Sequence, residues 1–443
     1  MSLATWGEAP GGSPDLPPSL VRLCVQKLAQ NLIKYGPKKV RFGRLSGLPR
    51  AALEALLEVL VARNALNDNV LPYALTRQTQ RLCLEGSSQL RRCLLNTVGR
   101  SCPHLRILDV RACQQVDNRI VRDVLQHCEH LRTLRVDGCT RISDSAFAPA
   151  LWKPPLAGLL GLHELSLGKC GQVTAEGLMG YVVKGAPFLK SLGLSHCRLT
   201  VTDEVAAELL FNFGLEAVDL SFCAQVTDAP FQARPACMLR ELRVAGAAIT
   251  DAAVESIAPR AAGLEVFDAA NVMRLGDRGV AALAAACPAL RSLCLCNTQI
   301  TDAAFEALAR CPRLEELDAS WCLRATPRAL EVLAGAFGGG GGRRPGPPPL
   351  RELNLDHMGA FGLDDRGDFL GAPAIPASPE LWRSKSSCPA ISATSSPNLL
   401  LNWLPAAGRR GEEEGDERDG ADDGAAEPVR QPPPGRHRGA EAA

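Results

Sequence analysis

Seventeen cysteines and seven histidines are the residues of this 443-residue chain most able to act as nucleophiles, bases or metal ligands. A zinc site would need close C-x-x-C pairs with further Cys or His partners, and disulfides would need paired cysteines. Cys294 and Cys296 form a C-x-C without a second couple, and the histidines are scattered. The sequence motifs of phosphate loops, zinc proteases and serine hydrolases are absent. We therefore expect no enzymatic activity, no metal and no cofactor.

The cysteines recur at a regular spacing. One set follows the central residue of a leucine-rich phrase by five positions: Cys113, Cys139, Cys170, Cys197, Cys223 and Cys322. A second set precedes the next phrase: Cys102, Cys128, Cys287 and Cys311. This spacing predicts small buried residues whose thiols donate weakly to loop backbone. Free thiols favour a reducing compartment, so we expect a cytoplasmic or nuclear protein, or both.

The phrase itself, L-x-x-L-x-L-x-x-C, predicts the elements that hold these residues. Its central residues are Leu82, Leu108, Leu134, Leu165, Leu192, Val218, Leu242, Phe267, Leu293, Leu317 and Leu353. A repeat of this kind predicts an α/β leucine-rich-repeat solenoid, a horseshoe with a concave parallel β-sheet and convex helices. Most phrases are followed by an apolar residue, Thr or Ser, and Asp, as at Ile249-Thr250-Asp251. Because the Asp recurs once per repeat, we interpret it as a helix cap, with the Thr beside it as the alternative cap.

Composition divides the chain into four parts. Residues 1–18 are rich in Gly and Pro, which predicts disorder, and residues 19–75 predict helices that form a cap or an adaptor-binding box. Residues 76–358 hold about 11 repeats with a Gly/Pro insertion at 338–349, and 359–443 predict a disordered, acidic, Pro/Ser-rich tail. A net charge of +1 gives no reason to expect nucleic acid or membrane as a partner. No secretory signal or apolar span is visible.

Cys at the place where most leucine-rich repeats have Asn, followed by I/V-T-D, resembles the cysteine-containing subfamily of leucine-rich repeats. That subfamily is best known from F-box leucine-rich-repeat proteins and from antagonist of mitotic exit network protein 1. The resemblance covers roughly two thirds of the chain. It implies a substrate receptor of a cullin-RING ubiquitin ligase, or a scaffold with no ligase link.

Three interpretations of the amino-terminal helices remain open. Residues 19–28, SLVRLCVQKL, resemble an elongin-binding box at Ser19, Leu20, Cys24 and Leu28, and Leu48-Pro49 resembles the start of a cullin-2 box. That match implies elongin B/C with a cullin as partners. Residues 48–60 also resemble the opening of an F-box, which implies an F-box adaptor with cullin-1, although no Trp lies between residues 7 and 151. The third interpretation is a plain cap on the exposed end of the solenoid.

Acidic residues dominate the strand positions that are expected to face outward on the concave side. Eleven acids stand there against four arginines, and they include Asp109, Asp137, Asp219, Asp268, Asp318 and Asp356. This excess predicts a protein substrate with a basic segment. Trp321 is the expected aromatic anchor, with packing in the core or a loop as the alternative. The alternative interpretation is that these acids serve only solubility.

Overall fold

The structure is a computed structural model that describes residues 20–35, 50–148, 157–212, 214–232, 238–337 and 350–356. The chain divides into two compact units, Met1–Ala393 and Thr394–Ala443, and every described residue belongs to the first. The predicted disordered segments at 1–18 and 359–443, and the predicted insertion at 338–349, lie outside the described residues.

The described strands form one parallel sheet in sequence order, and each is three residues long. They are β1 (Arg81–Cys83), β2 (Ile107–Asp109), β3 (Thr133–Arg135), β4 (Glu164–Ser166), β5 (Ser191–Gly193), β6 (Ala217–Asp219), β7 (Glu241–Arg243), β8 (Val266–Asp268), β9 (Ser292–Cys294), β10 (Glu316–Asp318) and β11 (Glu352–Asn354). The central residue of each strand pairs with that of the next, from Leu82 and Leu108 to Leu317 and Leu353. These are the positions that the repeat predicts, so the predicted α/β solenoid is confirmed.

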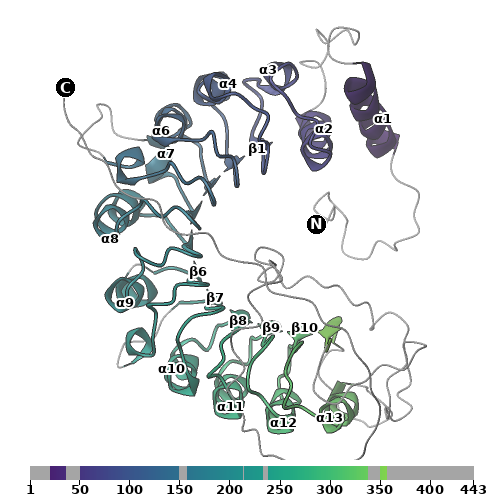
Figure 1. Cartoon of the computed structure of the whole chain (residues 1–443), viewed down its shortest axis with the longest axis vertical. Helices are drawn as coiled ribbons and strands as arrows, with labels where there is room; N and C mark the ends of the chain where they lie inside the picture. The colour runs from purple at the N-terminus through teal and green to yellow at the C-terminus, as the bar shows by residue number, and fades with distance from the viewer. Residues whose placement is uncertain are drawn as a thin grey trace, which may run out of the picture. The chain divides into compact units, whose positions relative to one another are not determined.

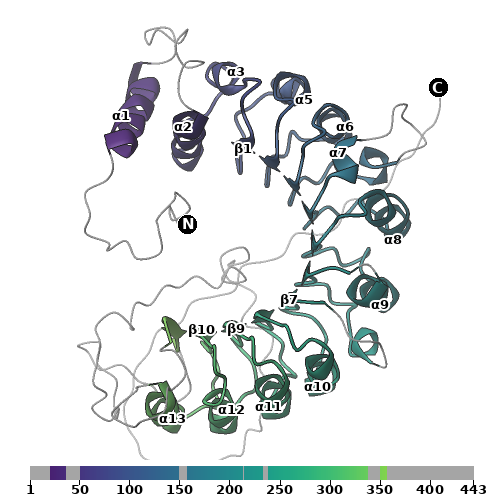
Figure 2. The ribbon, with the colours of Figure 1, turned by 180° about the vertical axis from the view of Figure 1, so that it is seen from behind.

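Helices or short helical turns follow the strands. The α-helices after β1 are α4 (Arg92–Leu95), α5 (Val98–Ser101), α6 (Asn118–His127), α7 (Ala157–Leu160), α8 (Ala175–Gly177), α9 (Asp203–Asn212), α10 (Asp251–Ile257), α11 (Asp277–Ala286), α12 (Asp302–Leu308) and α13 (Arg328–Phe337). Shorter or irregular turns are η2 (Asp144–Ala146), η4 (Leu178–Val183), η5 (Ala229–Phe231) and η6 (Ala258–Arg260). The strands line the inner side of the arc of repeats and the helices its outer side (Figures 1 and 2).

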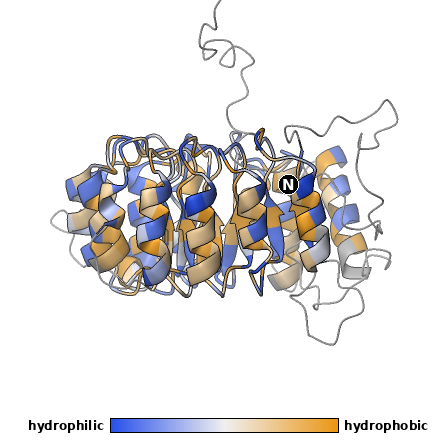
Figure 3. Cartoon of the chain, turned by 90° about the horizontal axis from the view of Figure 1, so that it is seen from below, coloured by the Kyte–Doolittle hydropathy of each residue, from blue (hydrophilic) through white to orange (hydrophobic). Residues whose placement is uncertain are grey.

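The core lies between the strands and the helices. The helices are amphipathic, with polar and apolar bands along their length (Figure 3), and they bury their apolar sides against the sheet. Phe147, Phe231, Phe267 and Phe305 are the largest fully buried side chains. Among the described helices, none has the length and apolar content that a bilayer crossing requires.

In the described part of the chain, three helices precede the first strand: α1 (Leu20–Tyr35), α2 (Arg50–Ala62) and α3 (Leu71–Ala74). Helix α2 packs on β1 and buries Leu56, Leu57 and Leu60. Helix α1 packs on α2 in turn. The edge of the sheet at β1 is therefore covered, as a terminal cap of a solenoid requires.

The buried cysteines form a ladder from repeat to repeat. Each thiol after a strand donates to a carbonyl oxygen of the preceding repeat, with sulfur to oxygen distances of 3.0–3.3 Å. Near the helix ends, the Cys128 thiol donates to the Cys102 carbonyl at 3.3 Å. These cysteines are free and buried. The prediction of structural thiols with a weak backbone bond is confirmed.

The recurring Asp has a different role from the one we predicted. In α10 and α12 the cap is the Thr before the Asp, since Thr250 and Thr301 accept backbone N–H bonds from their helices. The Asp reaches the next repeat instead and accepts both N–H and hydroxyl of its Thr at 2.6–2.8 Å. The pairs are Asp144–Thr174, Asp203–Thr227, Asp228–Thr250, Asp277–Thr301 and Asp302–Thr326. Asp117 departs from this pattern and caps its own helix α6.

Candidate functional site

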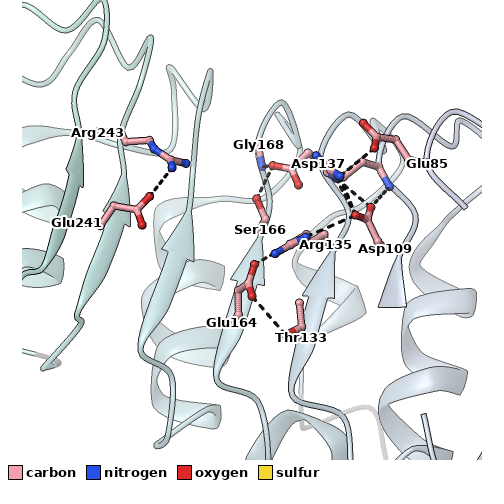
Figure 4. Close-up of polar contacts among 11 residues, drawn as sticks. Glu85, Asp109, Thr133, Arg135, Asp137, Glu164, Ser166, Gly168, Glu241 and Arg243 are labelled. Carbon is pink, nitrogen blue, oxygen red and sulfur yellow. Dashed lines mark hydrogen bonds and ion pairs between the residues drawn. The ribbon is translucent and has the colours of Figure 1, made fainter. Parts of the chain in front are cut away.

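Three of the acids over β1–β4 on the concave face, Glu85, Asp109 and Glu164, are tied into an ion-pair network (Figure 4). The Arg111 guanidinium donates to both carboxylate oxygens of Asp109, at 2.9 and 3.0 Å from Nε, and to Glu85 at 2.9 Å. Arg135 lies between Asp109, at 3.7 Å, and Glu164, at 2.6 Å. The hydrogen bond with Asp109 raises the pKa of Arg111 above its ordinary value. Asp109 is only 3% exposed, so this carboxylate offers little to a partner.

Asp137 lies half-buried beside this network. Its Oδ1 accepts the Ser166 hydroxyl at 2.5 Å and the Gly168 N–H at 2.9 Å, both from the next repeat. Its Oδ2 is buried and has no hydrogen-bond partner among the described residues. Burial raises the pKa of the Asp137 carboxyl, although the two hydrogen bonds oppose the change. Asp137 therefore joins two repeats rather than projecting freely into the concave space.

The aspartates that end β6, β8 and β10 shape the turn after each strand. Asp219, Asp268 and Asp318 each accept the backbone N–H two residues later, at 2.9, 3.0 and 3.0 Å. Such a bond turns the chain away from the strand direction. It gives these residues a structural reason to be Asp that is independent of any partner.

A charge excess nevertheless remains on one half of the face. Over β1–β4, the outward columns hold four acids (Glu85, Asp109, Asp137 and Glu164) against three arginines (Arg81, Arg111 and Arg135). Over β6–β11 they hold seven acids against Arg243, which pairs with Glu241 at 2.7 Å. The seven are Asp219, Glu241, Asp268, Glu316, Asp318, Glu352 and Asp356. The acidic character predicted for the whole face thus belongs to its β6–β11 half.

Trp321 lies on the rim where the chain leaves β10. The residue four positions after each of the first ten central residues has a positive φ: Gly86, Ala112, Gly138, Lys169, His196, Phe222, Gly246, Asn271, Asn297 and Trp321. Its N–H donates to the next repeat, as from Trp321 to the Asp356 carbonyl at 2.8 Å. Trp321 is 42% exposed, so its side chain is not in the core.

Two other aromatic side chains of this rim stack on each other. The rings of His196 and Phe222 lie 4.5 Å apart and are nearly parallel. Burial is the main cause that lowers the pKa of His196. Gly246 makes room for the stack, because a Cβ there would lie 2.7 Å from the Phe222 ring. The sequence pointed to His196, Phe222 and Trp321 as strand-end residues beside the concave face, but the positive φ of the whole column was missed, although Gly or Asn at five of its ten positions was the available signal.

The amino-terminal helix α1 has separate buried and exposed sides. Val25, Ala29 and Leu32 are buried, and α2 is the helix packed against α1. Cys24 is exposed and Leu28 is partly buried, while Leu20 begins the helix one turn before Cys24. Leu48 and Pro49, like Ser19, lie outside the described residues. Leu28 packs against the core, so Cys24 is the residue of the predicted adaptor-binding stripe that the structure shows to be exposed.

Comparison with known proteins supports the repeat architecture. The Leucine Rich repeat family model matches residues 236–258, which include β7 and all of α10. Among solved structures, the chain is similar to the yeast Rad7 and Elc1 complex, with 21% identity, a TM-score of 0.56 and coverage of 83% of this chain and 98% of that one. The mouse RP105/MD-1 complex matches at 17% identity and a TM-score of 0.35, over 63% of this chain and 42% of that one.

A search of curated proteins found no match. The eleven in-register strands and the repeat-family match carry the assignment, and the Rad7 likeness agrees with it at the level of the fold. The chain is a leucine-rich-repeat solenoid.

Proposed function

We propose that this solenoid is a non-enzymatic protein-interaction module that acts as a substrate receptor of a cullin-RING ubiquitin ligase. The observation that carries the proposal is the exposed Cys24 on α1, which lies at helical spacing from Leu20 and from Leu28, a residue that packs partly against the core. A small exposed thiol between two leucines, each one turn away, suits close approach of another helix. The box that this stripe resembles makes elongin B/C with a cullin the proposed adaptor.

The likeness to Rad7 supports an interaction role in a limited way. At 21% identity it concerns the fold, and that structure is a complex with a second protein, Elc1. A solenoid of this architecture can therefore hold a protein partner. An F-box adaptor with cullin-1 is the second ligase partner to test, since Leu48-Pro49 also resembles the opening of an F-box.

We place the substrate on the β6–β11 half of the concave face. Asp219, Asp268, Asp318 and Asp356 supply negative charge there, and Trp321 lies on the adjoining rim as an exposed aromatic side chain. A basic segment of the substrate matches this charge, which sets encounter rate and specificity more than raw affinity. Asp109 and Asp137 keep a supporting role, because the Asp109 carboxylate pairs with Arg135 and the Asp137 carboxylate accepts the Gly168 N–H, each from the next repeat. The buried free thiols favour a cytoplasmic or nuclear location.

The alternative function is a scaffold with no ligase link, and one observation favours it. Helix α2 covers β1 and α1 covers α2, so the two helices already serve as the cap of the solenoid. A cap needs no adaptor. The two functions differ in whether the Leu20–Cys24–Leu28 stripe binds another protein.

Titration of the purified full chain with purified elongin B/C tests the adaptor directly. We expect Leu20→Asp with Cys24→Asp to abolish binding without unfolding the chain, because Cys24 is exposed. Gln26→Asp with Gln30→Asp is the matched control, since it adds the same charge at the same helical spacing on another side of α1. Binding that survives in the Leu20/Cys24 variant, or that is lost equally in the control, would remove the proposed stripe.

A further inference from the structure

A second candidate binding site lies on the rim of the solenoid, where the chain passes from β8, β9 and β10 to the following helices. A hollow of about 310 Å³ opens there. Its lining is Asp251, Arg274, Gly276, Asp277, Arg278, Gln299, Thr301 and Arg324. Neither the ligase interpretation nor the concave face uses these residues.

Unequal turn lengths account for the hollow. From the central strand residue to the buried apolar residue that closes the turn, the chain runs from Phe267 to Leu275 after β8 and from Leu317 to Ala325 after β10. After β9 it runs from Leu293 to Ile300, one residue fewer. The Gln299 N–H donates to the Leu275 carbonyl at 3.0 Å, which draws this short turn against the turn before it. Space is left between the longer turns that carry Arg274 and Arg324.

Two of the three arginines that line this hollow have no partner in the described part of the protein. Arg274 and Arg324 form no hydrogen bond or ion pair with any residue that the structure describes. Arg278 pairs with Glu255 through two bonds of 2.9 Å, and its side chain is 77% exposed. Two guanidiniums without a protein partner, beside the amide of Gln299, form a set of donors that suits an anion with several acceptor oxygens.

The two acids in the lining are already engaged. Asp277 accepts the N–H and the hydroxyl of Thr301, both at 2.7 Å. Asp251 accepts the N–H groups of Gly276 and Gly279, at 2.8 and 3.0 Å. Their carboxylates face backbone and hydroxyl donors, so they do not satisfy the guanidiniums of Arg274 and Arg324. The lining carries three guanidiniums against two carboxylates.

We propose that this hollow binds the phosphate of a phosphorylated serine or threonine on a partner protein. A phosphate dianion offers three strong acceptor oxygens. It can therefore accept hydrogen bonds from two guanidiniums at once better than a ligand with a single carboxylate can. Met273 and Leu323, next in sequence to Arg274 and Arg324, are 55% and 66% exposed. These apolar side chains give the residues that flank the phosphate a surface to pack on. The site is independent of the proposed ligase link, because it uses no residue of α1.

Phosphorus NMR of inorganic phosphate with the full chain provides the first test. We expect saturable binding that Arg274→Gln with Arg324→Gln weakens by about tenfold or more, since two charge-assisted contacts are lost. The matched control is Arg141→Gln with Arg198→Gln, which removes the same charge from exposed arginines of other rim turns. Absence of saturable binding, or equal binding by both double variants, would overturn the proposal. Acetate that binds as tightly as phosphate would overturn it too.

A peptide assay then tests the source of the phosphate. The probe is a short fluorescent peptide with one phosphoserine between apolar residues, compared with its unphosphorylated twin. We expect the phosphopeptide to bind more tightly than free phosphate does and the twin to show no binding. A phosphopeptide that binds no better than free phosphate would exclude a protein-borne ligand. Because the arginines are exposed, their variants should keep the native unfolding midpoint.

Discussion

Removal of the Asp228 carboxylate tests whether the recurring Asp joins one repeat to the next. Asp228 follows β6 and accepts the N–H and the hydroxyl of Thr250 at 2.7 Å each, and Thr250 caps α10. A hydrogen bond to a charged acceptor contributes about 1.5–3 kcal/mol, and the lower end applies to this partly buried site. Asp228→Ala should therefore reduce the free energy of unfolding by about 3 kcal/mol.

Urea unfolding followed by circular dichroism measures this loss. Asp228→Asn keeps a neutral acceptor, so we expect about half the loss. Glu208→Ala is the control, because Glu208 is an exposed helical acid on α9 and should change stability by less than about 0.5 kcal/mol. If Asp228→Ala were as stable as this control, the contact between repeats would contribute nothing and our reasoning would be refuted.

Three further predictions concern the thiols and the concave face. Cys24 and Cys93 should react quickly with an alkylating agent in the folded protein, whereas Cys139, Cys170 and Cys197 should react slowly. Mass spectrometry measures these rates, and equal rates would contradict the burial of the second group. Burial raises the pKa of Cys113 to about 11 and of Cys139 to about 12, from 9.0. Above pH 9.0 the folded state therefore binds more protons than the unfolded state. The free energy of unfolding, measured with urea, should fall from pH 9.0 to about pH 12. A free energy that stays constant over this range would contradict the prediction. Asp318→Lys with Asp356→Lys should weaken binding of an oligolysine peptide severalfold. Trp321→Ala should weaken binding of a protein partner recovered by affinity purification. The control Glu129→Lys with Glu176→Lys, at exposed acids in other parts of the repeats, should leave the affinity for the peptide unchanged. A peptide affinity that stays constant between about 50 and 300 mM salt would refute the concave site.

The repeat was predictable from the sequence because each repeat must bury the same residue types. Leu82, Leu108 and Leu134 sit at a constant spacing, and that spacing alone places them side by side in the sheet. The thiols were predictable for the same reason, since Cys113 and Cys139 keep a fixed offset from those leucines.

The contacts between repeats were not predictable in the same way. Asp228 was misinterpreted because its partner, Thr250, lies in the next repeat, and local capping rules consider one helix at a time. The burial of Asp109 depends on Arg111 and Arg135 from two different repeats. Of these contacts, only that of Asp109 with Arg111 lies within one phrase.

The two candidate surfaces were predictable to different degrees. Helical spacing indicated a stripe at Leu20, Cys24 and Leu28, but which side of α1 faces α2 depends on the packing of Val25, Ala29 and Leu32. The rim position of Trp321 depends on its φ of +62°, which sequence pattern alone does not indicate for a Trp. The rim hollow was not predictable from one repeat, because it depends on how the turns of three neighbouring repeats, with different lengths, lie against one another.

Affinity purification of the full chain from cells, with the Leu20→Asp, Cys24→Asp variant beside it, tests the central proposal most directly. If the solenoid is a ligase receptor, mass spectrometry should recover elongin B/C and a cullin with the native chain and lose them with the variant. The Gln26→Asp, Gln30→Asp control should retain them. Recovery of the F-box adaptor with cullin-1 instead would keep the receptor function and change the adaptor. Recovery of neither pair with the native chain would contradict the ligase role and leave the scaffold.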